Sequence, residues 1–301
     1  MKITFLGTSS MVPTKDRNVQ AIFLRYKAEG ILIDCGEGTQ RQMNIAGINR
    51  NKVNKVLISH WHGDHVSGLI GLIQTLGNNM EEKPVLQVYG PKGTKERMHH
   101  MLKTVVFDNN RVELKIHELN PKNIKKFFEN DNYYIECAYL NHSVPCLGYN
   151  FIEKDRLRID VKKAKKIGLK QGPLMGKLQK GKTVEFKGKK IKPEDVTYNV
   201  KGKKITFILD TLPCTNAVKL AKDADLMICE SVYHSSLKEK SHVYKHMTAQ
   251  DAALIANKAN AKKLILTHFS QRYKEINEVL KDAKDVFNNT EAAFDFKNVK
   301  V

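Results

Sequence analysis

The chain has 301 residues, 41% of them hydrophobic and 28% charged, and its 51 lysines and arginines against 32 aspartates and glutamates give a net charge of +19. This length and composition suit one large globular domain or two small ones, and they exclude a disordered chain. No apolar run approaches the ~20 residues that span a bilayer, which excludes a membrane-spanning protein.

The first third of the sequence predicts strands followed by strand–helix alternation. A helix is expected at 39–47, and apolar residues recur at helical spacing over 66–76. The last strand before that helix runs directly into a cluster of histidines, so the cluster lies at a strand-to-helix junction. The expected strands are 2–7, 20–26, 30–36 and 55–60.

The middle of the chain predicts strands at 85–90, 112–118, 133–140 and 147–153, with a helix at 94–105. A glycine- and lysine-rich segment with weak hydrophobic periodicity follows. This composition suggests that residues 154–204 form an arm or insertion rather than core, and we expect regular structure to resume only after it.

Positive charge is concentrated around this arm. Residues 153–204 hold 18 lysines and arginines against 6 acidic residues, or +12, while the other 249 residues share +7. A solvated lysine-rich surface is the alternative reading. A concentrated excess is more typical of a surface that binds a polyanion, and we therefore predict nucleic acid as the partner.

The last third returns to alternating strands and helices. Strands are expected at 203–210, 225–231 and 263–270, and helices at 216–222, from Thr248 onward, and at 273–287. Thr248 and Asp251 have the spacing of a capping box. The order of elements predicts one α/β domain over 1–301, with two sheets packed together and helices outside, an αββα sandwich.

The five cysteines are scattered, odd in number and form no CxxC pair. The N-terminus alternates like a strand and lacks the apolar core of a signal peptide. Both features indicate reduced thiols and a cytoplasmic protein.

The stretch "SHWHGDHVSG" places His60, His62, Asp64 and His65 within six residues. Alternate residues of an extended segment point the same way and lie about 6.6 Å apart, so the first two histidines can face one metal ion. Gly63 lets the chain turn, and the remaining pair can face a second ion. Imidazole plus carboxylate without thiolate suits Zn²⁺ or Mn²⁺, so we favour a two-metal site over an exposed histidine-rich loop.

Further ligands are expected where strands end. His142, Asp210 and His268 each close a predicted strand, and the aspartate could bridge two ions through its two oxygens. His246, just before a helix, stays open as a site residue. The other histidines are predicted to be structural or on the surface: His99, His100, His117, His234 and His242.

Several segments together resemble the ribonuclease Z family, which processes the 3′ ends of transfer RNA and has the metallo-β-lactamase fold. The resemblance spans nearly the whole chain and is more specific than the histidine cluster alone. The matching segments are "PTKDRN" (13–18), "DCGEGTQRQ" (34–42), "SHWHGDH" (59–65), "NHSVPCLGY" (141–149), "HMTAQDAA" (246–253) and "HFSQRY" (268–273).

The resemblance implies a role for each residue of the site. One zinc ion would be bound by His60, His62 and His142, and the other by Asp64, His65 and His268, with Asp210 bridging. Asp64 would also be the general base, and His246 would assist proton transfer to the leaving oxygen with Glu230 as its partner. The implied activity is a zinc-dependent endoribonuclease that leaves a 3′-hydroxyl on tRNA and a 5′-phosphate on the trailer.

The resemblance also implies how precursor tRNA is bound. The arm would grip the tRNA body through a Gly-Pro tip in "GPLMGKLQKG" (172–181), typically across a homodimer. The implied substrate-binding residues are Pro13, Lys15, Arg17, Asn18, Gly172, Pro173, Gly176, Lys177 and Arg272.

Three alternatives remain open at this point. The first is a hydrolase of the same fold that acts on a thioester, lactam or cyclic phosphodiester, although such an enzyme needs no basic arm. The others are a non-catalytic RNA-binding protein and an exonuclease. The chain departs from the family pattern at Trp61, where a smaller aliphatic residue is usual, and at Leu209, where glycine is common.

Overall fold

The computed structural model describes residues 1–78, 83–106, 108 and 110–301. Its contacts divide these residues into two compact units. The first unit comprises 1–128, 135–151 and 204–301, and the second comprises 129–134 and 152–203. None of the helices within the described ranges has the length and apolarity to cross a membrane.

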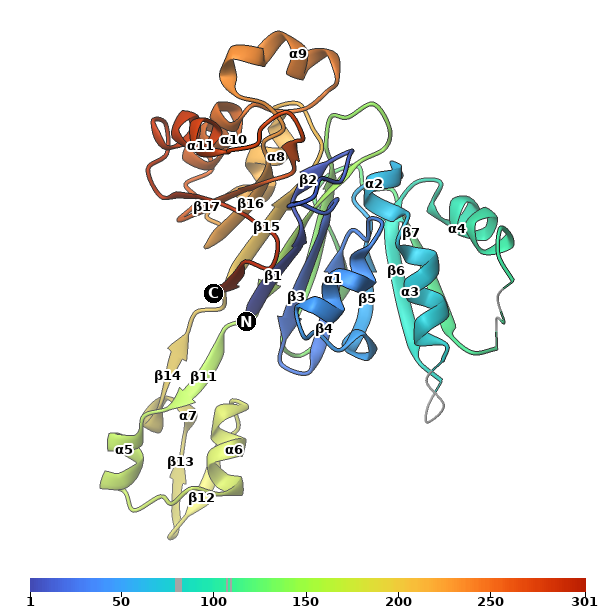
Figure 1. The fold of residues 1–301 in the computed structure, drawn as a ribbon. Coiled ribbons are helices and arrows are strands. Elements are labelled where there is room, and N and C mark those ends of the chain that lie inside the picture. The colour runs from blue at the N-terminus through green and yellow to red at the C-terminus, as the bar shows by residue number, and fades with distance from the viewer. Residues whose placement is uncertain (79–82, 107, 109) are drawn as a thin grey trace. The chain divides into compact units, whose positions relative to one another are not determined.

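The first unit contains two seven-stranded sheets (Figure 1). In the first sheet, β1, β3 and β4 pair antiparallel, whereas β4, β5, β6 and β7 pair parallel. The order of its strands is β20 (Asn298–Lys300), β1 (Lys2–Gly7), β3 (Ala21–Tyr26), β4 (Glu29–Ile33), β5 (Val53–Leu57), β6 (Val85–Pro91) and β7 (Glu113–Leu119).

The second sheet is parallel over β15, β16, β17 and β19. Its strand β8 was not expected, because two aromatic residues among charges give no clear alternation. The order of its strands is β19 (Thr290–Ala292), β17 (Leu264–Thr267), β16 (Leu226–Glu230), β15 (Lys204–Ile208), β10 (Leu147–Glu153), β9 (Tyr133–Tyr139) and β8 (Lys125–Glu129).

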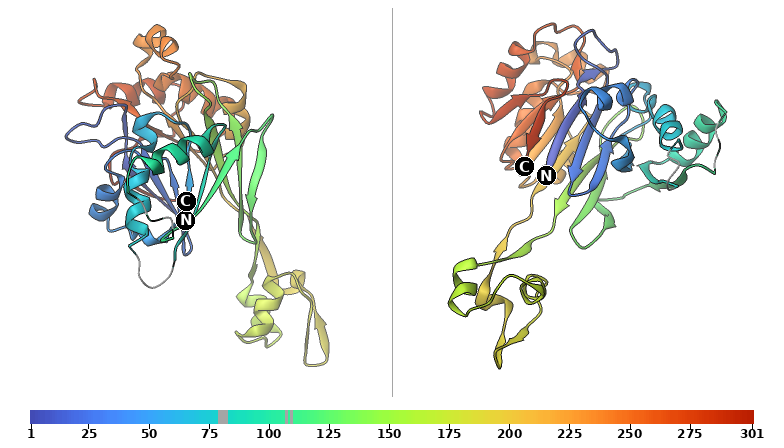
Figure 2. Two further views of the ribbon diagram at one scale, coloured as in Figure 1. Left: turned by 90° about the vertical axis from the view of Figure 1, so that its right-hand side faces the viewer. Right: turned by 60° about the horizontal axis from the view of Figure 1, so that its bottom comes forward.

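Helices cover the outer face of each sheet (Figure 2). The helices on the first sheet contribute Met43, Leu72 and Met98 to a core that they share with sheet residues such as Val56. The predicted capping box is confirmed, since Thr248 and Asp251 exchange hydrogen bonds at the start of α10. The helices are α1 (Thr39–Ile45), α3 (Leu69–Leu76) and α4 (Thr94–Lys103) on the first sheet, and α8 (Thr215–Ala221), α10 (Ala249–Lys258) and α11 (Asn277–Lys284) on the second.

The inner faces of the two sheets pack against each other. The Tyr149 hydroxyl of β10 donates to the Ile58 carbonyl at the end of β5 (2.6 Å), and the Tyr26 and Phe151 rings lie 5.2 Å apart. Phe5 and Phe207 are fully buried. The αββα sandwich predicted from the sequence is therefore confirmed, and the carboxyl ends of β4, β5 and β15–β17 supply the loops that carry the candidate site.

Short elements complete the first unit. They are β2 (Ser9–Ser10), β18 (Phe269–Ser270), α2 (Gly63–Val66), α9 (Lys238–Val243) and the 3₁₀ turns Arg50–Lys52 and Ser235–Leu237. The pairing of β2 with β18 joins the start of the chain to the segment after His268.

The second unit has regular structure, contrary to the expectation of an arm without it. Six buried side chains, Ala164, Leu169, Leu178, Val184, Ile191 and Val196, form a small core of its own. Because these apolar positions are spread among lysines and glycines, their pattern was not visible as periodicity. The elements are β11 (Arg156–Ile159), α5 (Val161–Lys166), α6 (Pro173–Gln179), β12 (Val184–Phe186), β13 (Lys189–Ile191), α7 (Pro193–Val196) and β14 (Thr197–Val200).

Candidate metal centre

Three side chains of the site stand directly after strands, on backbone of left-handed conformation. Asp34 follows β4 with φ 57°, Asp210 lies just beyond β15 with φ 42°, and His268 follows β17 with φ 60°. Such φ values are unfavourable for residues other than glycine and concentrate at functional sites. The left-handed turn at each strand end redirects the chain into the loop while the side chain stays at the site.

The histidine cluster supplies four more side chains from a single loop. β5 ends at Leu57, and α2 begins at Gly63, with His62 as the residue that precedes the helix. His60 and His65 are fully buried, whereas Asp64 is partly exposed. The loop therefore directs two groups inward and leaves one side open to a substrate.

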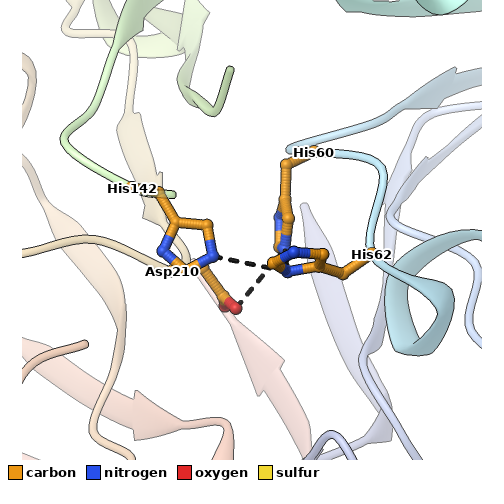
Figure 3. Close-up of side chains that lie close together, drawn as sticks. All are labelled: His60, His62, His142 and Asp210. Carbon is orange, nitrogen blue, oxygen red and sulfur yellow. Dashed lines mark hydrogen bonds and ion pairs between the residues drawn. The ribbon is translucent and has the colours of Figure 1, made fainter. Parts of the chain in front are cut away.

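The first ligand group lies around His62 (Figure 3). His62 Nδ1 is 2.9 Å from His60 Nε2 and 3.4 Å from His142 Nε2. Asp210 Oδ2 lies 3.5 Å from His60 Nε2. The ligand atoms of these four residues all lie within 4.8 Å of one another, close enough to share one ion.

The second ligand group lies around Asp64. Its Oδ2 is 3.3 Å from His65 Nε2 and 3.4 Å from His268 Nε2. Asp210 contacts this group as well, with Oδ2 at 3.5 Å from His65 Nε2 and Oδ1 at 3.2 Å from His268 Nδ1. The structure thus brings together all seven residues expected from the sequence, and Asp210 lies between the two groups.

The imidazoles are held by partners on their other nitrogens. His65 Nδ1 is 2.6 Å from Asp34 Oδ2, His60 Nδ1 is 3.0 Å from the Ser59 hydroxyl, and His142 Nδ1 is 2.9 Å from the Lys245 carbonyl. Such outer partners fix ring orientation and direct the second nitrogen towards a metal.

None of these partners was predicted from the sequence. Asp34 could have been found, because it lies near the end of a predicted strand (30–36) and opens the segment "DCGEGTQRQ". Ser59 and Lys245 give no such signal. The Met11 backbone N–H is a further partner, which donates to Asp64 Oδ2 at 2.8 Å.

The electrostatics of the cluster divide its histidines into two kinds. Burial and the neighbouring imidazoles hold the pKa of His60 well below its usual value. Burial also lowers the pKa of His65, but Asp210, Asp34 and Asp64 outweigh it and raise the pKa well above its usual value. Three carboxylates around one imidazole create an environment that stabilises a positive charge.

This environment fits a divalent cation. Within the described residues, His65 Nε2, His268 Nδ1 and Asp210 Oδ1 are buried and lie 3.2–3.3 Å from other ligand atoms, yet none of them makes a hydrogen bond of acceptable geometry, which is uncommon for polar atoms in a folded protein. The donors are imidazole nitrogens and carboxylate oxygens, the ligands of zinc and similar metals. The cluster is therefore a divalent-metal site.

His246 and Glu230 lie beside this cluster and contact each other. His246 Nδ1 is 3.2 Å from Glu230 Oε2, and the buried Glu230 carboxylate also accepts the backbone N–H groups of Thr211 and Met247. Burial lowers the pKa of His246, but Glu230 raises it, and the balance lies at about 9. An imidazolium at this position can donate a proton.

The segment 13–18 divides into exposed and engaged residues. Pro13 and Lys15 are exposed. Arg17 donates from Nη2 to the carbonyls of Tyr273 (2.7 Å) and Ser270 (3.2 Å), so its guanidinium fastens the segment to the chain after His268.

Asn18 and Arg272 also have partners within the protein. The backbone N–H of Asn18 donates to Asp295 and its side-chain amide donates to the Glu37 carbonyl. Arg272 is exposed and lies over the Tyr233 ring at 5.3 Å. In the second unit, the expected Gly-Pro tip is the start of helix α6, where Gly172, Pro173 and Lys177 are exposed and Gly176 is partly buried.

Comparison with known proteins identifies the family. Residues 1–155, about half of the chain, match the model of the family described as "Anti-Pycsar protein Apyc1", and the chain belongs to that family on the basis of this match. Over its full length the chain is 42% identical to ribonuclease Z of Methanothermobacter thermautotrophicus, covering 100% of this chain and 97% of the relative. The chain belongs to the ribonuclease Z family. Ribonuclease Z of Archaeoglobus fulgidus is 38% identical with the same coverage of both chains.

Solved structures agree with this assignment to the ribonuclease Z family. The short form of human tRNase Z superposes with a TM-score of 0.73 at 26% identity, covering 100% of this chain and 99% of that one. The metallo-β-lactamase fold protein YhfI of Bacillus subtilis superposes with a TM-score of 0.71 at 17% identity over 99% and 98%, which supports the fold alone. The protein is thus an endoribonuclease, a phosphodiester hydrolase, with the metallo-β-lactamase fold.

The two departures from the ribonuclease Z pattern have structural partners. Trp61 packs against the core of the first sheet, and its indole N–H donates to the Thr94 hydroxyl at 2.9 Å. Leu209 is buried, and its carbonyl accepts from the Cys146 thiol at 3.4 Å. Both residues contribute to packing around the ligand loops.

Proposed function

We propose that this protein is a zinc-dependent endoribonuclease that removes the 3′ trailer from precursor tRNA. It leaves a 3′-hydroxyl on the tRNA and a 5′-phosphate on the trailer. The observation that carries the proposal is the convergence of seven ligand side chains from loops that follow strands of both sheets, in a chain related to ribonuclease Z over its whole length.

The proposed cofactor is a pair of Zn²⁺ ions in each subunit, for which Mn²⁺ can substitute. Two such ions, when bound, lower the pKa of coordinated water and offset negative charge on the phosphoryl oxygens. The residues that would hold them are His60, His62 and His142 for one ion, and Asp64, His65 and His268 for the other, with Asp210 between.

Asp64 and His246 have complementary roles in proton transfer. Burial raises the pKa of Asp64, but the nearby His65 and His268 outweigh it and hold the pKa far below its usual value, so this carboxyl is ionised. As an ionised acceptor among the metal ligands, it is proposed to orient the attacking water and to take its proton. The water oxygen forms a bond to phosphorus while the bond from phosphorus to the 3′ oxygen breaks. His246, held by Glu230, donates its proton to that oxygen.

Precursor tRNA is the proposed substrate, with the second unit as the surface that attracts it. The charge of +12 over 153–204 and the exposure of Gly172, Pro173 and Lys177 support this role. Lysines bind phosphates without reading sequence, so selection would be by shape. Pro13, Lys15 and Arg272, with the segment around Arg17 and Asn18, are proposed to contact the acceptor end.

The proposal includes a homodimer and a cytoplasmic location. Homodimers are the commonest soluble oligomers, and in the proposed arrangement one subunit's arm would hold the tRNA that the other subunit cleaves. All five cysteines are free in the structure, which agrees with a reducing compartment.

The decisive experiment is incubation of purified protein with a 3′-extended tRNA, followed by mapping of both product ends. A single trailer fragment with a 5′-phosphate is expected. Mononucleotides would identify an exonuclease instead, and no cleavage with turnover of a cyclic phosphodiester would identify a small-molecule hydrolase. Asp210→Asn, which removes one carboxylate oxygen between the two groups, is the matched inactive control.

A further inference from the structure

Three exposed apolar side chains gather at the mouth of the metal centre. Met11, Val243 and Tyr244, which we call the apolar rim, are 77%, 76% and 56% exposed. They line one cavity of about 530 Å³. The same cavity is lined by the site residues His62, Asp64, His142, Asp210 and His246.

The backbone of the rim is fastened to the ligands themselves. Met11 has φ 60°, and its N–H donates to Asp64 Oδ2 at 2.8 Å. Tyr244 precedes Lys245, which has φ 55° and whose carbonyl lies 2.9 Å from His142 Nδ1. Left-handed residues of this kind are strained and persist where the surroundings hold them.

These bonds do not explain the rim's side chains. On the rim side, each of these two bonds is made by a backbone atom, the Met11 N–H or the Lys245 carbonyl. A small polar residue at Met11 or Tyr244 would therefore allow the same bonds. Large apolar groups exposed together at a site of chemistry mark a contact surface. Lys240, 5.9 Å from the centre of the Tyr244 ring, adds a positive charge beside that ring.

The chemistry of the site determines what this surface contacts. A phosphodiester at the metal centre brings one nucleoside on each side of its phosphorus, and their bases must lie at the mouth of the cavity. Phosphates prefer cations, whereas the flat faces of bases prefer aromatic and apolar side chains. An apolar rim around the ligands therefore suits bases, and only unpaired bases expose their faces.

We propose that the apolar rim packs against the unpaired bases on either side of the scissile phosphate, with Tyr244 as the stacking surface. This inference rests on the proposed function and deepens it. The rim positions the single-stranded junction between acceptor stem and trailer over the metal centre. Selection for an unpaired junction follows, because a base inside a duplex offers no free face.

The test is equilibrium binding to the metal-loaded full-length protein. The ligand is a 3′-extended tRNA whose bridging 3′ oxygen at the cleavage position is replaced by a methylene group, so that it binds without being cut. A second ligand lacks the two bases that flank this linkage. The protein variants are Tyr244→Ala, Tyr244→Phe and Leu254→Ala, the last a control because Leu254 is exposed (39%) but does not line the cavity.

Tyr244→Ala is expected to weaken binding of the base-containing ligand about 5- to 150-fold, the range for loss of one stacked base. Its binding of the abasic ligand should match that of wild type. Tyr244→Phe and Leu254→Ala should bind both ligands as wild type does. Equal weakening on both ligands, or no weakening on either, would overturn the inference.

Two further measurements distinguish this inference from an interface between copies of the chain and from the proposed function itself. Light scattering of Tyr244→Ala should give the mass of wild type, whereas a changed mass would assign the rim to an interface between copies and overturn the inference. Cleavage of the natural precursor by wild type tests the proposed function separately. If wild type cleaves the precursor, but Tyr244→Ala weakens binding of the base-containing and abasic ligands equally, the rim proposal fails and the proposed function stands.

Discussion

The metal centre and the second unit place polar residues in opposite ways. In the metal centre, His60, His65 and His268 are fully buried, and the ring of His65 is held by Asp34 from a distant segment. In the second unit, a core of six side chains supports a surface on which most lysines are exposed. One region excludes water from its charges, and the other presents its charges to water.

This difference teaches how the two regions contribute to one reaction. Charges in a buried cluster interact strongly and salt barely screens them, so changes there should affect the rate of the chemical step. Exposed lysines attract a polyanion over a distance and are screened by salt, so changes there should affect binding. Three predictions test this division, and a fourth concerns the pH dependence of stability outside both regions.

Asp64→Ala is expected to have the largest effect. Loss of a ligand that also accepts the proton should lower kcat for precursor tRNA by about 10³-fold or more. Binding of the same tRNA, measured by filter retention, should remain close to wild type. A similar loss of binding and of rate would break the division between the two regions.

Asp34→Asn should weaken metal binding without removing a ligand. The carboxylate that accepts from His65 Nδ1 would be replaced by a neutral amide, and loss of such outer partners costs about 10- to 100-fold in metal affinity. Competition with a chromophoric chelator measures this directly. Unchanged affinity would mean that Asp34 supports folding alone.

Replacing exposed lysines of the second unit should raise the KM. We expect Lys170, Lys177, Lys180 and Lys182, changed together to serine, to raise the KM for precursor tRNA about tenfold, because phosphate contacts supply much of the affinity. Hydrolysis of a small phosphodiester should not change. Substitution is preferred to deletion of this segment, because a deletion would also remove Leu169 and Leu178 from the core of the second unit.

The salt dependence provides the control for these lysines. Each lost phosphate contact should reduce the slope of log affinity against log salt by about 0.7–0.9. The matched variant changes Lys219, Lys258, Lys281 and Lys284, which lie on helices of the first unit, to serine. If both sets raise the KM equally, net charge rather than the second unit attracts the substrate.

The smallest effect is expected from the pH dependence of Asp295. Its carboxylate accepts from the Thr8 hydroxyl, the Asn18 backbone N–H and the Gln42 amide, and burial raises its pKa to about 6 from 3.8. A carboxyl whose pKa is raised by folding stabilises the protein below pH ~4, and this contribution is lost as the pH rises through about 6.

Melting temperatures of wild type and Asp295→Asn across pH 4–7 measure this contribution. The asparagine does not titrate, so wild type should lose a few degrees relative to the variant over this interval. A constant difference would show that the carboxyl keeps an ordinary pKa in the folded protein. Metal binding should be unaffected in both, since Asp295 contacts none of the ligands.

Much of the fold followed from the sequence because its signals are local. Alternation predicted β1, β3 and β4 within a few residues, and helical spacing predicted α3 and α10 with its capping box. The second unit was misjudged as lacking regular structure. Its short helices and strands gain stability from a core that forms only when scattered apolar residues meet.

The sequence alone determined which residue types could hold metal. Three histidines and an aspartate in six positions, with His142, Asp210 and His268 at strand ends, specified a ligand set. Asp210 and His268 come after β15 and β17, which run parallel in one sheet on either side of β16, so these two strand ends lie at the same edge. That information is carried by spacing and strand order.

Only the tertiary structure decided what holds and surrounds those ligands. Asp34 meets His65 across 31 positions of sequence, and the Lys245 carbonyl meets His142 across 103. The apolar rim joins Met11 to Val243 and Tyr244, which no local pattern relates. Backbone groups make several of these contacts, and because every residue has the same backbone, side-chain identity cannot reveal them.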